Sequence, residues 1–156
     1  MDNARWQYRH DRDPREAIFD FKRRTLVHFA VDTKAVFMTT RLAGTATRFL
    51  PFNRGCRGGA GNPPDPAGRT YRTAYLWEEA LQRDSLLDLL VRFIHLQIEE
   101  KHDEHGHKVK KETMIFPRYH QLQAVRTLVD SARAAKALGA ITFGSSYFAD
   151  RNAILE

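Results

Sequence analysis

Cysteine is nearly absent from this chain, and long hydrophobic runs are absent altogether. Cys56 is the only cysteine among 156 residues, so no internal disulfide can form, and we expect a reducing compartment such as the cytoplasm. No stretch approaches the roughly 20 consecutive apolar residues of a membrane helix. The charged segment Met1–Trp6 also lacks the apolar core of a signal peptide. The sequence therefore predicts a cytoplasmic protein with no membrane partner.

Acidic residues are scarce in one region of the chain. The formal net charge is +6, and between residues 41 and 72 a single acid, Asp65, accompanies six arginines. These are Arg41, Arg48, Arg54, Arg57, Arg69 and Arg72. Because the guanidinium fork suits phosphate groups, we predict that they contact DNA; alternatively, they only keep a loop-rich surface soluble. A hydrophobic content of 42% and a charged content of 28% are typical of a globular protein and exclude wholesale disorder.

Two short segments rich in β-branched and aromatic residues predict strands, at Leu26–Val31 and Val36–Thr40. The Asp-Thr-Lys-Ala segment between them favours a hairpin turn. In the first segment the alternate residues from Val27 to Val31 are the larger apolar set, so we expect this set to face the core. A third, edge strand is expected over Thr47–Phe52 and should end at Pro51, because proline cannot donate to a ladder.

The spacing of apolar residues predicts helices in three places. One, within Met1–Arg24, can begin at Asp13-Pro14 and use Ala17, Ile18, Phe19 and Phe21 as its apolar face; the segment predicts a short helix or, alternatively, a loop. Another region, Tyr75–Gln97, is expected to be helical, and Asp84 or Ser85 can cap a second helix within it. This second helix has only a narrow polar strip, so we expect it to be largely buried, with His95 as a core or interface histidine. The part of this region that precedes Asp84 has an apolar stripe of its own, formed by Leu76, Trp77, Ala80 and Leu81. The last helix is expected over Pro117–Ala135.

Two segments are expected to be irregular. Asn53–Gly68 is rich in glycine and proline pairs and predicts a loop; no Gly-Lys-Ser/Thr follows, so it resembles a phosphate-binding glycine loop only superficially. Residues 99–112 are dense in charge and predict a linker. Histidines at positions 102, 105 and 107 offer an alternative, a transition-metal site, but their spacing matches no known closed site and we favour the linker. In the tail, only Ile141–Phe143 indicates a short strand.

Eight short motifs follow one another in an order that resembles a known family. Those of the first half are Leu26-Val-His-Phe-Ala-Val-Asp32, Met38-Thr-Thr-Arg-Leu-Ala-Gly44, Arg48-Phe-Leu-Pro-Phe-Asn-Arg-Gly55 and Gly59-Ala-Gly-Asn-Pro63. Those of the second half are Tyr75-Leu-Trp-Glu-Glu79, Asp84-Ser-Leu-Leu-Asp88, Arg92-Phe-Ile-His-Leu96 and Ile115-Phe-Pro-Arg-Tyr-His-Gln121. With the opening Trp6-Gln-Tyr-Arg-His-Asp-Arg-Asp-Pro14, they resemble the restriction (R) subunit of type I restriction-modification enzymes over residues 4–135.

The resemblance implies a place within that subunit. The family's R subunit carries a RecB-like nuclease that needs Mg²⁺ and a D…ExK set. Two helicase-like ATPase domains then pump double-stranded DNA, and a helical part docks on the methyltransferase and specificity subunits. For this chain it implies an α/β fold, with a short mixed or antiparallel sheet and flanking helices at residues 1–98, the end of the nuclease domain. A charged linker at 99–114 and the first ATPase helix within 115–156 follow.

The resemblance also implies roles for single residues. Gln7 and Tyr8 match the glutamine and tyrosine that help to orient the nuclease site, although they are adjacent here and spaced in the family. The alternative is that they simply begin a helix. Gln121 matches the glutamine that reads the adenine edge of ATP, and Arg118 would approach the nucleotide or its phosphates. The alternative for Gln121 is an exposed helix residue without a ligand.

Catalytic motifs of the family are missing from the sequence. No strand carrying a Glu-x-Lys is expected after Asp11, Asp13, Glu16 or Asp20, and no Gly-x-x-x-x-Gly-Lys-Ser/Thr loop follows Gln121. We therefore expect no catalytic residue, bound metal or cofactor in this chain alone, and a marginally stable fold. The likeness fades near Ala135, which we interpret as the result of a frameshift or a truncated gene. The alternative function is a stand-alone, non-catalytic basic module for DNA binding or assembly.

Overall fold

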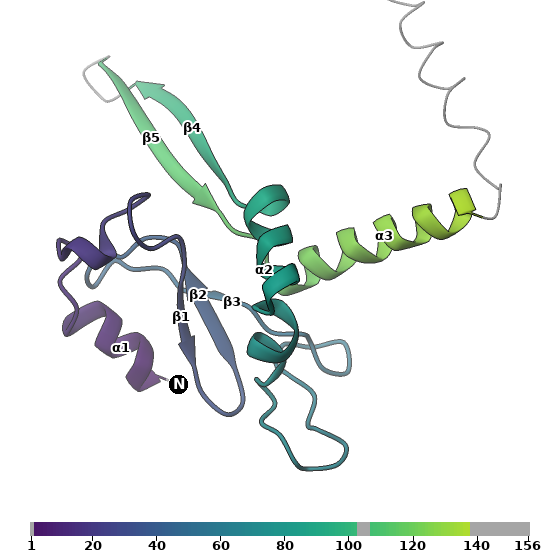
Figure 1. The fold of residues 1–156 in the computed structure, drawn as a ribbon. Coiled ribbons are helices and arrows are strands. Elements are labelled where there is room, and N and C mark those ends of the chain that lie inside the picture. Colours follow the sequence, from purple (N-terminus) through teal and green to yellow (C-terminus); the bar gives the residue numbers. More distant parts are fainter. Residues whose placement is uncertain (1, 103–106, 138–156) are drawn as a thin grey trace, which may run out of the picture. The chain divides into compact units, whose positions relative to one another are not determined.

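The computed structural model of the chain describes residues 2–102 and 107–137 (Figure 1). The chain divides into two compact units, Met1–His120 and Gln121–Glu156, whose boundary falls inside helix α3 (Tyr119–Ala137). In its described part the first unit holds small antiparallel sheets and short helices. The fold is therefore mixed α/β, and this part of the sequence-based prediction is confirmed.

A small antiparallel sheet lies in the first half of the chain, in the order β1-β2-β3. Its strands are β1 (His28–Val31), β2 (Val36–Thr39) and β3 (Leu50–Pro51). The turn after β1 is closed by the Asp32 carboxylate, which accepts the backbone N–H groups two and three residues further on at 2.7 and 2.8 Å. The predicted hairpin and the edge strand that ends at Pro51 are both confirmed.

The face of β1 that we expected to point away from the core is the more deeply buried one. His28 is 5% exposed and Ala30 1%, whereas the larger Phe29 and Val31 are only half-buried. The reason is helix α1 (Asp2–His10), which packs on this side of the sheet. The sheet is thus covered on both faces, whereas the alternation of apolar residues in the sequence had predicted a single buried face.

A cluster of aromatic rings fills the opposite face. Phe52 lies 5.5 Å from Phe29 and 5.9 Å from Phe116, measured between ring centroids. The Tyr119 ring meets Phe52 edge-on at 5.7 Å and Tyr75 at 5.0 Å. Such tilted and edge-on contacts are favourable beyond simple burial. This cluster joins the sheet, the helical segment and the first residues of α3.

The N-terminal helix lies earlier in the chain than expected. For the segment around Asp13-Pro14 we predicted a short helix or a loop, and it holds only a single 3-10 turn, η1 (Ala17–Phe19). The Asp13 carboxylate instead accepts bonds from the backbone N–H of Arg15 at 2.9 Å and from its guanidinium at 3.1 Å. Local bonding of this kind stabilises a turn in competition with a helix.

The region Tyr75–Gln97 is helical only as far as Phe93. It consists of η2 (Leu76–Ala80), α2 (Arg83–Asp88) and η3 (Leu89–Phe93). The first and last pieces are π-helical turns, closed by bonds from Leu81 N–H to the Leu76 carbonyl and from Ile94 N–H to the Leu89 carbonyl. The prediction that the helix continues to Gln97 is wrong, because a strand follows.

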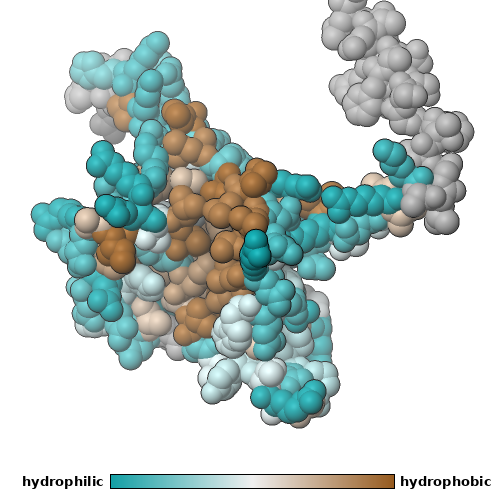
Figure 2. All heavy atoms as spheres, viewed as in Figure 1, coloured by the Kyte–Doolittle hydropathy of each residue, from teal (hydrophilic) through white to brown (hydrophobic). Residues whose placement is uncertain are grey.

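This helical region is also far more exposed than predicted. Leu76, Ala80 and Leu89 are buried, but most of the other large apolar side chains are not. Figure 2 shows hydrophobic side chains gathered on the surface of the molecule. The exposed ones from this region are Trp77, Leu86, Leu87, Leu90 and Val91. The expectation that the helix after Asp84 is largely buried is therefore wrong.

Two long paired strands hold residues 99–102 and 108–114 of the segment that we expected to be a charged linker. Strands β4 (His95–His102) and β5 (Lys108–Ile115) pair antiparallel, with His102 opposite Lys108. His95 is accordingly an exposed strand residue and not a core helix residue. The charges themselves explain the pairing, because the register sets Glu99 opposite Lys111 and the following glutamate opposite Lys110, and opposite charges across strands are stabilising.

Helix α3 confirms the helix expected over Pro117–Ala135, with a slightly later start. The strand expected at Ile141–Phe143 lies outside the described residues. In the described part of the chain, no helix combines the length and the apolar character that crossing a membrane requires.

Candidate functional site

The glycine-rich loop after β3 is tied to the sheet by two asparagine side chains. Asn62 is buried, accepts the Arg54 backbone N–H at 2.8 Å, and donates to Asn53 Oδ1 at 2.9 Å and to the Lys34 carbonyl at 3.1 Å. Asn53 Oδ1 also accepts the Val36 N–H at 2.8 Å. The irregular loop predicted over Asn53–Gly68 is confirmed, and its base has a fixed hydrogen-bonded geometry.

Two glycines allow the loop to close on itself. The Gly55 N–H donates to the Gly61 carbonyl at 2.8 Å. The two residues have φ angles of 87° and 113°, which residues other than glycine rarely adopt. Inside this closure Cys56 and Gly59 exchange two backbone bonds of 3.0 and 2.8 Å. The loop therefore presents backbone, with few bulky side chains, on its inner side.

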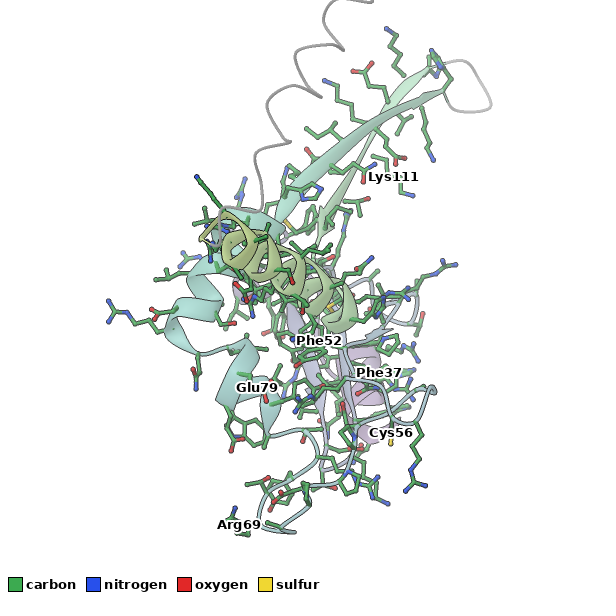
Figure 3. The ribbon with its side chains drawn as sticks, turned by 90° about the vertical axis from the view of Figure 1, so that its right-hand side faces the viewer. Phe37, Phe52, Cys56, Arg69, Glu79 and Lys111 are labelled. Carbon is green, nitrogen blue, oxygen red and sulfur yellow. The ribbon has the colours of Figure 1, made fainter. Side chains whose placement is uncertain are left out.

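Arg54 is held in place by a carboxylate and two aromatic rings. Its Nη1 donates to Glu79 Oε1 at 3.2 Å, and its guanidinium carbon lies 5.7 Å from the Tyr75 ring centroid and 5.8 Å from that of Tyr119. The Tyr119 hydroxyl donates to the other oxygen of Glu79 at 3.1 Å. Figure 3 shows Glu79 on the helical segment, beside the ribbon that carries Phe52. These contacts restrict the arginine to one orientation.

Arg54 lines a hollow of about 220 Å³ between the glycine-rich loop and the residues that begin α3. Arg118 and His120 line its other side. We call it the glycine-loop hollow; its remaining lining residues are Pro51, Asn53, Gly55, Gly59, Ala60 and Gly61. Two guanidinium groups and an imidazole beside exposed backbone suit an anionic group such as phosphate. Gln121 is the next residue along the chain, is exposed, and begins the second compact unit.

The six arginines predicted to contact DNA do not line a common hollow. Within residues 2–102, Arg54 alone of the six lines the glycine-loop hollow. Arg41 stacks on Phe21 at 5.0 Å, Arg48 lines a separate hollow beside the β5 end, and Arg69 lies on a different loop. Figure 3 shows Cys56, of the glycine-rich loop, well apart from Arg69. Arg57 and Arg72 are exposed loop residues.

Gln7 and Tyr8 line another hollow, of about 480 Å³, beside β1. Arg12 and Phe19 also line it. Tyr8 additionally packs against His28 at 5.7 Å, and its hydroxyl donates to the Phe29 carbonyl at 3.5 Å, so it anchors α1 to the sheet. Both residues lie on helix α1, and the structure brings them to one concave surface.

His28 is the buried titratable group of this region. It is 5% exposed and lies against the rings of Tyr8 and Phe19, at 5.7 and 5.6 Å. Burial disfavours the charged imidazolium and lowers the pKa of His28 below its usual 6.5. His28 is therefore a neutral packing residue at physiological pH.

The metal site considered for the histidines of residues 102–107 falls partly outside the described residues. Across residues 2–102 and 107–137, no group of three or more histidine, cysteine, aspartate or glutamate side chains is placed to hold a metal ion. His102 is the last residue of β4, His107 directly precedes β5, and both are exposed, whereas His105 lies outside the described residues.

Sequence reasoning missed several residues that the fold brings to these hollows. Glu79, Tyr75 and His120 lay within motifs of the family resemblance, but none of them was given a role at a site. Trp77 was expected in an apolar stripe but is 48% exposed. A π-helical turn puts Leu76 and Ala80 on its buried side and leaves Trp77 outside.

Comparison of the chain with protein-family models, curated proteins and solved structures gave no match.

Proposed function

We propose that this chain is a piece of the R subunit of a type I restriction-modification enzyme, inactive on its own. It would span the end of the RecB-like nuclease domain and the start of the helicase-like motor. The observation that carries the proposal is the glycine-loop hollow, which Arg54, Arg118 and His120 line together. Gln121 directly follows His120 in the sequence. The ordered motifs of the sequence and the basic net charge of +6 support the same reading.

In this proposal the residues at the start of α3 serve an adenine nucleotide. A glutamine amide can both donate to and accept from the adenine edge, which gives a paired hydrogen bond. Gln121 is exposed and has this chemistry. Arg118 and Arg54 would attract the phosphates, although Glu79 offsets much of the Arg54 charge. The nucleotide would bind weakly, because the phosphate loop and its lysine are missing.

Mg²⁺, which the family requires, has no fitting ligand set among the described residues. Both oxygens of Asp13 are bonded to Arg15, and in residues 2–102 and 107–137 no group of three or more histidine, cysteine, aspartate or glutamate side chains is placed to hold a metal ion. A divalent ion needs two or more carboxylates to activate water for phosphodiester hydrolysis. We therefore assign this chain no hydrolytic step, and its contribution would be to contact DNA and nucleotide within a larger assembly.

Nucleotide binding tests the proposal directly. We expect a fluorescent ATP analogue to bind the purified chain and to be displaced by ATP, without hydrolysis. Gln121→Ala and Arg118→Ala should weaken this binding, whereas Gln123→Ala, an equally exposed neighbour on α3, should leave it unchanged. If the analogue does not bind, or if both glutamine variants behave alike, the adenine role is wrong.

Double-stranded DNA is the second ligand to test. We expect affinity that falls with increasing salt, as counterion release requires. Arg57→Ala and Arg72→Ala should each reduce the affinity and the salt dependence, and Arg83→Ala, on α2, is the matched control. Cleavage of DNA or hydrolysis of ATP by the chain alone would contradict the proposed inactivity.

The rival function is a stand-alone basic module for DNA binding or assembly, which the net charge of +6 favours equally. Sequencing the DNA around the reading frame separates the two. The R-subunit proposal expects a Glu-x-Lys set encoded upstream and a Gly-x-x-x-x-Gly-Lys-Ser/Thr loop encoded downstream. If neither is encoded nearby, the stand-alone module is the better interpretation.

A further inference from the structure

Two exposed aromatic side chains flank a hollow that none of the functions above uses. This hollow has a volume of about 460 Å³ and lies between the loop that ends at Tyr71 and the helical turn η2. Tyr71 is 63% exposed and Trp77 48%, and both line it together with Arg69 and Glu78. We call it the aromatic hollow. Large aromatic rings that flank a concavity in this way are typical of binding surfaces.

The loop that forms one wall of the aromatic hollow is held at both ends. The Asp65 carboxylate accepts backbone N–H groups from Ala67, Arg69 and Thr70 at 3.1, 2.7 and 3.0 Å. These bonds lower the pKa of Asp65 below its usual range, so the carboxylate stays charged. At the other end the buried Thr73 hydroxyl donates to the Asp32 carbonyl at 2.7 Å. The backbone is thus fixed while the side chains of Arg69 and Tyr71 project from it.

The aromatic hollow offers one cationic and one anionic side chain, which together can meet the phosphate and the base of a nucleotide. Arg69 lines the hollow, and the nearby Arg72 is exposed. The acid of this loop, Asp65, directs its oxygens to backbone N–H groups. Among the residues that line the hollow, Glu78 is the acid. A carboxylate accepts hydrogen bonds from exocyclic amino groups of bases, notably that of cytosine.

We propose that the aromatic hollow binds an unpaired nucleobase of a single-stranded nucleic acid. Trp77 and Tyr71 supply the stacking surfaces, Arg69 contacts the backbone phosphate, and Glu78 accepts from the base edge. Stacking on aromatic side chains combined with a cationic contact is the usual chemistry of single-strand binding. This site goes beyond the proposed function, which concerns duplex DNA and adenine nucleotides; Arg69 is the one residue it shares with the arginines predicted to contact DNA.

Tryptophan fluorescence provides a direct test, because the chain has only two tryptophans, Trp6 and Trp77. In a Trp6→Phe background, the emission reports on Trp77 alone. We expect short oligodeoxycytidylate to quench this emission saturably, and the matching duplex to quench it less. Oligothymidylate should bind more weakly than oligodeoxycytidylate, since thymine lacks the amino group, and Glu78→Gln should reduce this difference. A parallel series with RNA shows whether the sugar matters.

Variants of the exposed side chains show whether quenching reflects this hollow. Tyr71→Ala and Arg69→Ala should each raise the dissociation constant about tenfold. Tyr71→Phe keeps the ring and should bind normally, and Arg83→Ala serves as the matched control for charge. All three positions are exposed, so unchanged circular dichroism is expected for the four variants.

Three outcomes would overturn the proposal. They are the absence of saturable quenching, equal affinity of Tyr71→Ala and the parent, and quenching by a proline-rich peptide in place of the oligonucleotides. Failure here leaves the duplex and nucleotide assays unaffected, because Tyr71→Ala should not alter either.

Discussion

Arg54 and Glu79, which are 25 positions apart in the sequence, form an ion pair of 3.2 Å beside the glycine-loop hollow. The second oxygen of Glu79 accepts the Tyr119 hydroxyl. One carboxylate thus links the loop after β3, the helical turn η2 and the first residue of α3. The same carboxylate offsets the positive charge that Arg54 brings to the hollow.

Glu79→Gln should strengthen the binding of anions at the glycine-loop hollow. The amide still accepts from the Tyr119 hydroxyl, but it no longer neutralises Arg54. We expect the fluorescent ATP analogue to bind more tightly to this variant and less tightly to Arg54→Ala. Because both partners of the ion pair are partly exposed, the free energy of unfolding should fall by no more than about 1 kcal/mol.

Glu78→Gln is the matched control for that experiment. It removes a charge at the adjacent position, but Glu78 lines the aromatic hollow. Its effect on the ATP analogue should therefore be small. If both variants raise the affinity equally, the change reflects only net charge, and the specific coupling of Glu79 to Arg54 is refuted.

His28 should make stability depend on pH below neutrality. Its pKa is lowered by burial in the folded state and is near 6.5 in the unfolded chain, so between these values the unfolded state binds more protons. The free energy of unfolding should therefore fall as the pH drops below 6.5, by at most about 1.4 kcal/mol per pH unit from this residue, until the folded pKa is reached.

Urea unfolding between neutral and mildly acidic pH measures this effect. The free energy of unfolding should depend less on pH in His28→Gln than in the parent. His95→Gln alters an exposed histidine and should keep the pH dependence of the parent. An unchanged slope in His28→Gln would show that another group causes the pH dependence.

Tyr75→Phe should destabilise the fold through one lost hydrogen bond. The Tyr75 hydroxyl is buried and donates to the Phe52 carbonyl at 2.5 Å, and burial raises the pKa of this tyrosine far above its usual 10. Removing the donor leaves a buried carbonyl without it, which costs about 1–3 kcal/mol. Tyr71→Phe removes an exposed hydroxyl and should be neutral, so equal unfolding midpoints for the two variants would contradict this account.

Local signals in the sequence predicted much of the secondary structure. The β1–β2 hairpin was predictable because Asp32 closes its own turn, and α3 because its apolar residues recur at helical spacing. The β4–β5 hairpin was missed because a dense run of charges resembles a solvated linker. The strand register, which sets Glu99 opposite Lys111, shows that opposite charges face each other across the two strands and favour their pairing.

The candidate site was harder to predict, because its contacts join distant positions. Arg54 and Arg118 were named for their charge, but nothing local indicated that they line one hollow. The resemblance to a known family supplied a role for Gln121, and it gave no reason to consider Glu79 or Trp77. Their importance follows from tertiary packing, which periodicity along the chain does not encode.

Asn62→Ala should disrupt the glycine-rich loop more than any other substitution in it. Asn62 is 3% exposed and makes three hydrogen bonds, to the Arg54 N–H, to Asn53 and to the Lys34 carbonyl. The substitution leaves these buried groups without their partner, so we expect the free energy of unfolding to fall by about 2–3 kcal/mol.

Asn62→Ala should also weaken the ATP analogue, because the Arg54 backbone loses its anchor, and urea unfolding with analogue titration measures both effects. Asn3→Ala, an exposed asparagine of α1, is the matched control and should change neither. If Asn62→Ala lowers stability but leaves the affinity intact, the loop is a structural element only, and the glycine-loop hollow is not where the nucleotide binds. If both fall together, the loop geometry and the binding of the anion depend on the same three hydrogen bonds.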